Sequence, residues 1–82
     1  MIDKDITVRI SQEDVRRANE RRRIGALLKA ERERQGMSGR DLAKKCGISQ
    51  SHIARIESGR YNITIDILSL VAESLGKKIK IE

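Results

Sequence analysis

Apolar and polar residues alternate at both ends of the chain and follow helical spacing between them. The segment DITVRI, residues 5–10, and the last six residues, KKIKIE, each place their aliphatic side chains on one side of an extended backbone, which predicts half-buried strands. These side chains are Ile6, Val8 and Ile10 in the first segment and Ile79 and Ile81 in the second. Because an isolated strand pair is only marginally stable, we expect one small sheet. It either joins both ends of one chain or pairs strands across a dimer.

A long helical stretch is predicted after the first strand. Ser11 and Asp14 are spaced as a capping box at its start, and Gly36 is placed to end it. Gly25 lies inside this stretch, where glycine is about 1 kcal/mol less favourable than alanine. The pattern therefore leaves open a break between Asn19 and Gly25.

Three shorter helices are predicted downstream, each preceded by a capping hydroxyl residue and followed by a glycine. The caps are Ser38, Ser49 and Thr64, and the glycines are Gly47, Gly59 and Gly76. Gly47 and Ile48 separate the first two of these helices, and two short helices joined by a turn with glycine form the helix-turn-helix pattern. The expected fold class is mainly α, with four or five helices and short β-strands at both termini.

The length of 82 residues suits one domain. Within it we expect an N-terminal strand arm over residues 1–12, a helix-turn-helix domain over 13–76 and a C-terminal strand over 77–82. The chain has no Phe and no Trp, and Tyr61 is its single tyrosine. It also has no Pro. The core must therefore be aliphatic, and both facts favour helices over a sandwich or barrel.

The second helix of the pair, at about residues 49–57, combines a packing side with a narrow polar strip. Ile53 and Ile56 fall in one sector at about 100° per residue. The opposite side presents side chains that are small or able to form hydrogen bonds: Gln50, Ser51, Ala54, Arg55 and Ser58. Such a strip lets a helix approach base edges in the major groove, where Gln pairs with adenine and Arg with guanine. The alternative is one more amphipathic helix in a small bundle.

The net charge of +6 is concentrated in the middle of the chain. Residues 21–60 carry eleven basic and four acidic side chains, or +7, whereas residues 1–20 carry four basic and five acidic and residues 61–82 carry three of each, together −1. A local excess of this kind favours a polyanion such as nucleic acid as partner. A solvated surface is the alternative, and charge alone does not separate the two.

The sequence predicts no enzyme, no cofactor and no metal site. The single histidine, His52, and the single cysteine, Cys46, have no partners at the spacing of a metal cluster or a catalytic triad. Cys46 cannot form an intrachain disulfide, which fits a reducing cytoplasm, and we expect it to be buried. No signal sequence and no apolar run of membrane-spanning length are present, so we expect a cytoplasmic protein without a membrane partner.

A series of motifs follows in order over about residues 23–76: Ile24-Gly25, Leu28, Arg32 four residues before Gly36, Met37-Ser38, Leu42-Ala43, Gly47-Ile48-Ser49, Ile53, Glu57-x-Gly59, Leu68, Val71-Ala72 and Leu75-Gly76. In this order the motifs resemble those of the XRE-type, phage-repressor-like helix-turn-helix proteins. Each motif alone is weak, but the combination is highly specific.

The resemblance implies a compact helical domain that binds operator DNA as a dimer. By position, the expected base-contacting residues are Gln50, Ser51 and Arg55. Ser58, Arg60 and Asn62 match sites near phosphates, and we also expect Ser38, Arg40 and His52 to contact phosphates. Arg32 and Glu57 match a buried ion pair that links the first long helix to the end of the reading helix.

One position departs from the family pattern. Many members have Gln at the start of the helix before the reading helix, where this chain has Gly39. That Gln normally contacts phosphate and braces the first residue of the reading helix, so the placement of Gln50 and Ser51 on DNA is left open, as is replacement of the anchor by Arg40. The cluster Arg21–Arg23 also keeps two interpretations, a solvated helix face or a phosphate clamp.

The leading functional hypothesis is a sequence-specific regulator that binds double-stranded DNA. We expect a repressor that acts as a homodimer on a palindromic operator, with an interface that includes Ile6, Val8, Ile10, Ile79 and Ile81. The alternative is an antitoxin that binds its own operator and a toxin protein, because the ending AESLGKKIKIE resembles the C-terminal strand of HipB-like antitoxins. A module for single-stranded RNA is disfavoured because Tyr61 alone makes no stacking platform.

Overall fold

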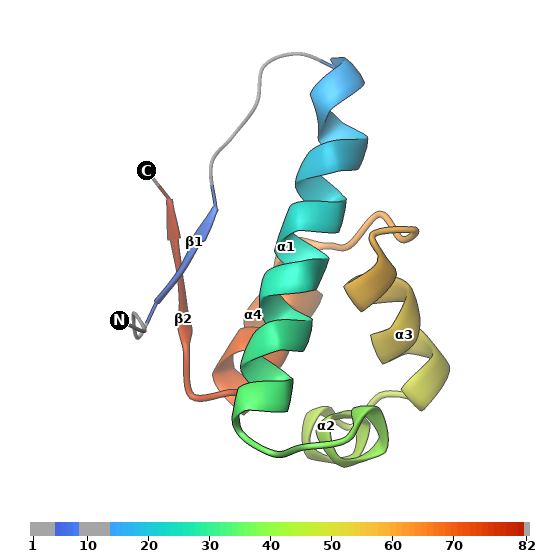
Figure 1. Cartoon of the computed structure of the whole chain (residues 1–82), viewed down its shortest axis with the longest axis vertical. Helices are drawn as coiled ribbons and strands as arrows, with labels where there is room; N and C mark the ends of the chain where they lie inside the picture. The colour runs from blue at the N-terminus through green and yellow to red at the C-terminus, as the bar shows by residue number, and fades with distance from the viewer. Residues whose placement is uncertain (1–4, 9–13, 82) are drawn as a thin grey trace.

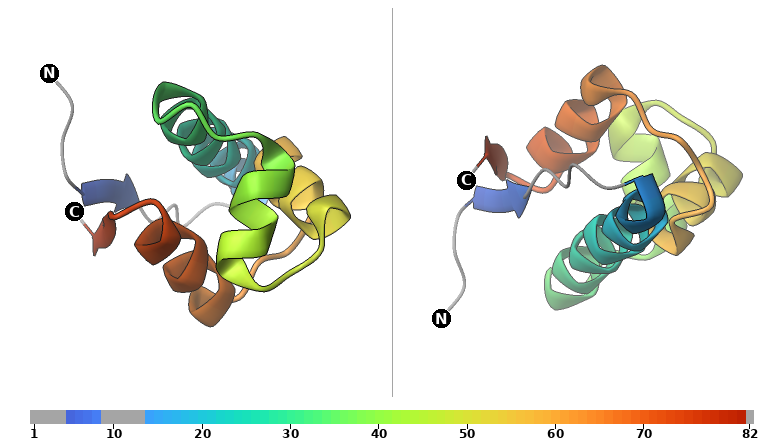
Figure 2. Two further views of the ribbon diagram at one scale, coloured as in Figure 1. Left: turned by 90° about the horizontal axis from the view of Figure 1, so that it is seen from below. Right: turned by 90° about the horizontal axis from the view of Figure 1, so that it is seen from above.

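The computed structural model of the chain describes the backbone of residues 5–8 and 14–81 and the side chains of residues 17–80. Four helices and two short strands follow in the order β1 (Asp5–Val8), α1 (Asp14–Arg34), α2 (Gly39–Cys46), α3 (Gln50–Ser58), α4 (Ile65–Ser74) and β2 (Lys78–Ile81). The two strands lie on one side of α1, and α3 lies on its other side (Figures 1 and 2). The expected fold, mainly helical with a strand near each end, is confirmed.

Helix α1 runs without a break through Gly25. The break left open between Asn19 and Gly25 is therefore absent. Tertiary packing explains why a glycine occupies this position. A β-carbon at Gly25 would stand 2.5 Å from the backbone oxygens of Ile56 and Glu57 in α3. The glycine lowers the helix propensity of α1 but permits the two backbones to approach.

The three shorter helices begin and end at the predicted residues. The side chains of Ser38, Ser49 and Thr64 accept backbone N–H groups of the following turn at 3.0, 3.1 and 3.2 Å. Asp41 returns a bond from its carboxylate to the Ser38 N–H at 2.9 Å, which completes a capping box and lowers the pKa of that carboxyl. Gly47, Gly59 and Gly76 adopt left-handed φ angles of 74°, 74° and 71° after the helices. The box predicted at Ser11 lies outside the described residues.

The core is aliphatic and is contributed by all four helices. The largest fully buried side chains are Leu28, Leu42, Ile53 and Val71. Cys46 is buried at the end of α2, as expected, and takes part in the same cluster. Buried Leu, Ile and Val side chains thus hold α3 against the rest of the helical core. The hydrophobic effect stabilises the fold by about 1.5–3 kcal/mol for each such fully buried side chain.

Strands β1 and β2 pair in parallel within one chain, in the register Ile6 with Ile79 and Val8 with Ile81. Of the two sheet arrangements left open by the sequence, this is the one that joins both ends of the chain. Ile79 is half-buried and packs against the core. Ile10 lies outside the described residues.

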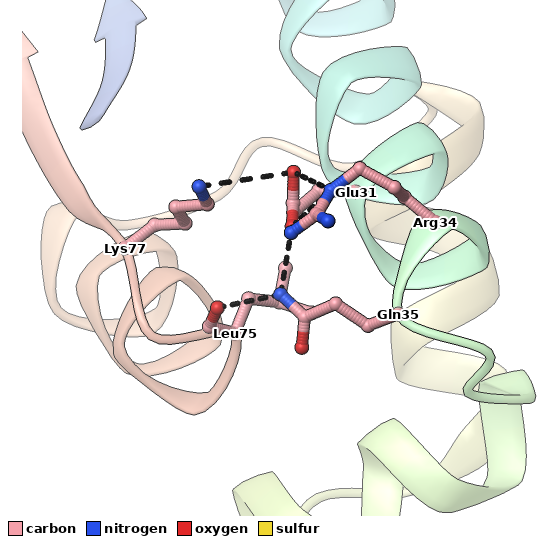
Figure 3. A network of polar contacts seen from close by, with 5 residues as sticks. All are labelled: Glu31, Arg34, Gln35, Leu75 and Lys77. Atoms are coloured by element: carbon pink, nitrogen blue, oxygen red, sulfur yellow. Dashed lines mark hydrogen bonds and ion pairs between the residues drawn. The ribbon is translucent and has the colours of Figure 1, made fainter. Parts of the chain in front are cut away.

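Polar contacts fasten the end of α1 to the end of α4 and the start of β2 (Figure 3). The Gln35 amide donates to the Leu75 carbonyl oxygen at 2.7 Å and to Glu31 Oε2 at 2.7 Å. Glu31 also accepts bonds from Arg34 Nε at 3.0 and 3.1 Å and lies 3.9 Å from Lys77 Nζ. These contacts fix where β2 leaves the helical body.

Candidate nucleic-acid interface

Helices α2 and α3 form a pair joined by a tight turn at Gly47, Ile48 and Ser49. The Gly47 and Ile48 N–H groups both donate to the Ala43 carbonyl oxygen, at 2.9 and 3.1 Å, which closes the end of α2. Helix α3 then begins at Gln50 and packs inward through Ile53 and Ile56, both buried. It lies at the edge of the helical body opposite the strands (Figure 1).

A buried ion pair connects α1 to the end of α3. Arg32 Nε donates to Glu57 Oε2 at 2.8 Å and Nη2 donates to Oε1 at 3.1 Å, while Nη1 donates to the Met37 carbonyl oxygen at 2.7 Å. The two side chains are 11% and 10% exposed. The pKa of Arg32 is raised, first because Glu57 accepts its hydrogen bonds. The pair expected between these residues is therefore formed, and it fixes α3 against α1.

Two glycines set the spacing between α1 and α3. Gly25 places the α1 backbone beside the carbonyl oxygens of Ile56 and Glu57. Gly59 has a left-handed φ of 74°, and a β-carbon there would stand 2.7 Å from the Arg22 Cα atom. The first close approach is at the last turn of α3, and the second is at the residue that ends the helix. Sequence reasoning missed both contacts, and the glycine inside a helical pattern was the signal that could have found the first.

The outward strip of α3 is exposed as the helical spacing predicts. Gln50, Ser51, Ala54, Arg55 and Ser58 all lie on the exposed surface. The Ser51 and Ser49 hydroxyl oxygens are 3.3 Å apart. Within the described residues, the side chains of Gln50 and Arg55 form no hydrogen bond or ion pair. The strip therefore presents short side chains and two longer polar ones, Gln50 and Arg55, on the exposed side of α3.

Gly39 lies next to the first residue of α3. A β-carbon at Gly39 would stand 3.9 Å from Gln50 Nε2 and 4.0 Å from Gln50 Cγ, which is ordinary van der Waals contact. The structure thus brings together the position that departs from the family pattern and the residue that it would brace. Arg40, the next residue, is exposed.

Five of the six residues expected near phosphates form two groups, one at the start of α2 and one at the end of α3. Ser38 and Arg40 lie at the start of α2, and the others, Ser58, Arg60 and Asn62, lie at the end of α3 and in the following loop; all five are exposed. Ser58 Oγ donates to the Arg55 carbonyl oxygen at 3.0 Å. In this rotamer its hydroxyl proton is occupied within the helix.

His52 has a packing contact that the sequence did not indicate. Its ring meets the Tyr61 ring edge to face, with centroids 4.8 Å apart and planes at 82°. The Nε2 atom is buried without a hydrogen-bond partner among the described residues. In this conformation Nε2 is therefore not accessible to a phosphate.

No group of three or more His, Cys, Asp or Glu side chains is arranged to hold a metal ion in the part of the chain that the structure describes. Among the same residues, no helix is long and apolar enough to cross a membrane.

A pair of short helices with an exposed second helix defines the helix-turn-helix class, in which that second helix lies in the major groove of DNA. A family model described as helix-turn-helix matches residues 28–81. The chain is also 36% identical over 56 residues to the immunity repressor protein of Bacillus phage phi105, a match that covers 68% of this chain. The chain therefore belongs to the XRE-type helix-turn-helix family. It spans 39% of the length of that curated relative.

Proposed function

We propose that the chain is a sequence-specific transcriptional regulator that binds double-stranded DNA and acts as a repressor, with α3 as its reading helix. The observation that carries the proposal is the combination of an exposed polar strip on α3 with a rigid attachment of the same helix. Two buried isoleucines, two glycine contacts and the Arg32–Glu57 pair hold α3 in place. A preorganised helix loses little conformational entropy when it enters a groove.

Base recognition is assigned to Gln50, Ser51 and Arg55. The first two occupy the first turn of α3, which is the part of a recognition helix that contacts base edges, and all three are exposed. Gln forms a bidentate pair with adenine, Arg forms one with guanine, and Ser bonds to several acceptors. Ala54 adds a methyl group that suits the thymine methyl.

Phosphate contacts are assigned to the two exposed groups beside α3. Ser38 and Arg40 lie at the N-terminal end of α2, where backbone N–H groups and the helix dipole favour anions. Arg60 and Asn62 lie in the segment after α3, and both are exposed. Ser58 and His52 belong to this group by position, but their hydroxyl proton and Nε2 atom are turned inward.

The repressor role draws on the similarity to a phage immunity repressor. Dimer formation would place two reading helices on half-sites about 34 Å apart, one turn of DNA. Within the described residues the sheet has two strands, β1 and β2, so each has one edge to which a strand of a second copy could pair. The proposed interface comprises Ile6, Val8, Ile10, Ile79 and Ile81. Removal of residues 77–82 should then give a monomer in light scattering, and a truncated chain that remains dimeric contradicts this interface.

Selection of bound duplexes from a random library tests the proposal as a whole. The expected result is enrichment of one sequence with two inverted halves. The centres of the two halves should be about 10 base pairs apart, which is one turn of DNA. Enrichment of a single unrepeated half supports base reading without the dimer. A library that stays random after repeated rounds contradicts sequence-specific binding.

A further inference from the structure

The N-terminal half of α1 lies directly against the end of the reading helix. Gly59 is buried, and a β-carbon on it would stand 2.7 Å from the Arg22 Cα and N atoms and 2.8 Å from Arg22 Cγ. Arg22 itself is exposed. Its side chain therefore emerges beside the segment from Ser58 to Asn62, to which the proposed function assigns phosphate contacts.

The three consecutive arginines of this segment do not have equal surroundings. Arg23 forms two hydrogen bonds with the Glu20 carboxylate, at 2.9 and 3.3 Å, and so is paired with an opposite charge. Arg21 is half-buried. Arg22 donates to the neutral side-chain oxygen of Asn19 at 3.1 Å, and no carboxylate partner is recorded for it among the described residues.

The local charge favours a polyanion at this surface. Residues 17–23 carry four arginines and one glutamate, which gives a net charge of +3. Arg60, the residue after Gly59, adds one more positive charge. Each strand of a duplex carries a phosphate about every 3.4 Å along the axis. A surface that lies beside one phosphate contact therefore lies beside the next one along the strand.

We infer that Arg22 contacts a DNA phosphate and, together with Arg60, extends the backbone contact from the loop after α3 onto α1. This inference rests on the proposed function, because it requires α3 to lie in the major groove. The guanidinium exchanges its bond to the neutral Asn19 oxygen for a bond to phosphate, in which both the donor and the acceptor carry a charge. Of the two interpretations of the arginine cluster, Arg22 is the phosphate contact and Arg23 belongs to a solvated ion pair.

Salt-dependent binding of the whole chain to a labelled duplex tests the inference. Arg22→Gln removes the charge but keeps the β- and γ-carbons that pack on Gly59, so the fold should be retained, and circular dichroism checks this. One lost phosphate contact lowers the slope of log affinity against log salt by about 0.9. The ratio of variant to wild-type dissociation constants should therefore fall about 3.5-fold between roughly 50 and 200 mM salt.

Two further variants make the result specific. Arg23→Gln removes the same unit charge from the adjacent residue and should leave the slope unchanged, whereas Arg22→Lys should keep the wild-type slope. An unchanged slope in Arg22→Gln overturns the inference, as does an equal fall in Arg22→Gln and Arg23→Gln, which would reflect net charge alone. A wild-type chain that binds no duplex at low salt overturns the proposed function, and the inference with it.

Discussion

Gly25 and Glu57 lie so close together that a β-carbon on the glycine would stand 2.5 Å from the Glu57 carbonyl oxygen. Helices α1 and α3 thus meet backbone to backbone at this point, and the absence of a side chain sets their distance. The Glu57 carboxylate meanwhile reaches back to Arg32 of α1. Glu57 of α3 is therefore held to α1 through both its backbone and its side chain.

The Gly25→Ala substitution should destabilise the fold. In an ordinary helix interior alanine is more stable than glycine by about 0.5–1 kcal/mol. Here the new methyl group would meet two carbonyl oxygens of α3, and overpacking of this kind costs about 1–3 kcal/mol. Gly39→Ala is the matched control, because its methyl group finds ordinary contact distances. Urea unfolding should show a lower midpoint for the first variant only, and a more stable Gly25→Ala chain contradicts the close packing.

The Glu57→Gln substitution should weaken both the fold and DNA binding. It leaves the Arg32 charge without its partner at a site where both side chains are about nine-tenths buried. Breaking a buried pair on one side costs about 3–5 kcal/mol. Joint replacement, Arg32→Met with Glu57→Leu, should recover much of the stability because no buried charge remains. Equal stability of the single and the double variant in urea unfolding would show that the stranded charge is not the cause.

The stability of the protein should fall in acid partly through Glu31. Its pKa is lowered in the folded chain, first by the hydrogen bonds from Arg34, against burial, and further by Gln35 and Lys77. A lowered folded-state pKa stabilises the fold above the unfolded value, and that stability is lost as the pH falls through the folded value. The loss should begin below about pH 4.3, the ordinary value for glutamate.

Glu31→Gln should therefore unfold more easily than wild type at neutral pH and should differ less from it in strong acid. Glu33→Gln is the control, since Glu33 is exposed on the same helix. Urea midpoints near about pH 7 and about pH 3 provide the comparison. A Glu31→Gln deficit of the same size at both pH values contradicts a role for the ionised carboxylate.

The helix boundaries could be predicted from sequence because their causes are local. A hydroxyl residue that caps one turn and a glycine that ends another act over four or five residues, and Ser38, Ser49 and Thr64 all cap as expected. The core of Leu, Ile, Val and Ala follows from the absence of larger aromatic side chains. These features locate α3 and its exposed strip before any tertiary contact is known.

The contacts that position α3 could not be predicted in the same way. From sequence, Gly25 was only a residue that lowers the helix propensity of α1. The backbone oxygens that leave no room for a side chain there belong to Ile56 and Glu57, about thirty residues further along the chain. The pairing of β1 with β2 was open for the same reason, since strand partners are not encoded in either strand alone. The contact of His52 with Tyr61 likewise depends on how the loop after α3 returns.

The Arg55→Ala substitution should relax sequence preference at one base pair of the selected operator. A bidentate arginine contact to guanine contributes about 1–3 kcal/mol of discrimination. Arg60→Ala, at an exposed position after α3, should instead weaken binding to all duplexes equally and lower the salt slope by about 0.9. Competition with operator variants separates the two effects. Unchanged operator preference in Arg55→Ala would mean that another part of α3 reads the bases.

The Gly39→Gln substitution should sharpen recognition at the base pair contacted by Gln50. A β-carbon at position 39 fits at 3.9 Å from Gln50 Nε2, so a glutamine amide built on it can reach the Gln50 amide and hold its rotamer. Fixing the rotamer before binding removes part of its entropy cost, about 0.5–1.5 kcal/mol for such a side chain. The variant should bind the operator up to about tenfold more tightly, since 1.4 kcal/mol corresponds to a factor of ten. Gly39→Ala fills the same space without an amide and should not produce this gain, so an equal gain in both variants would assign the effect to helix stability.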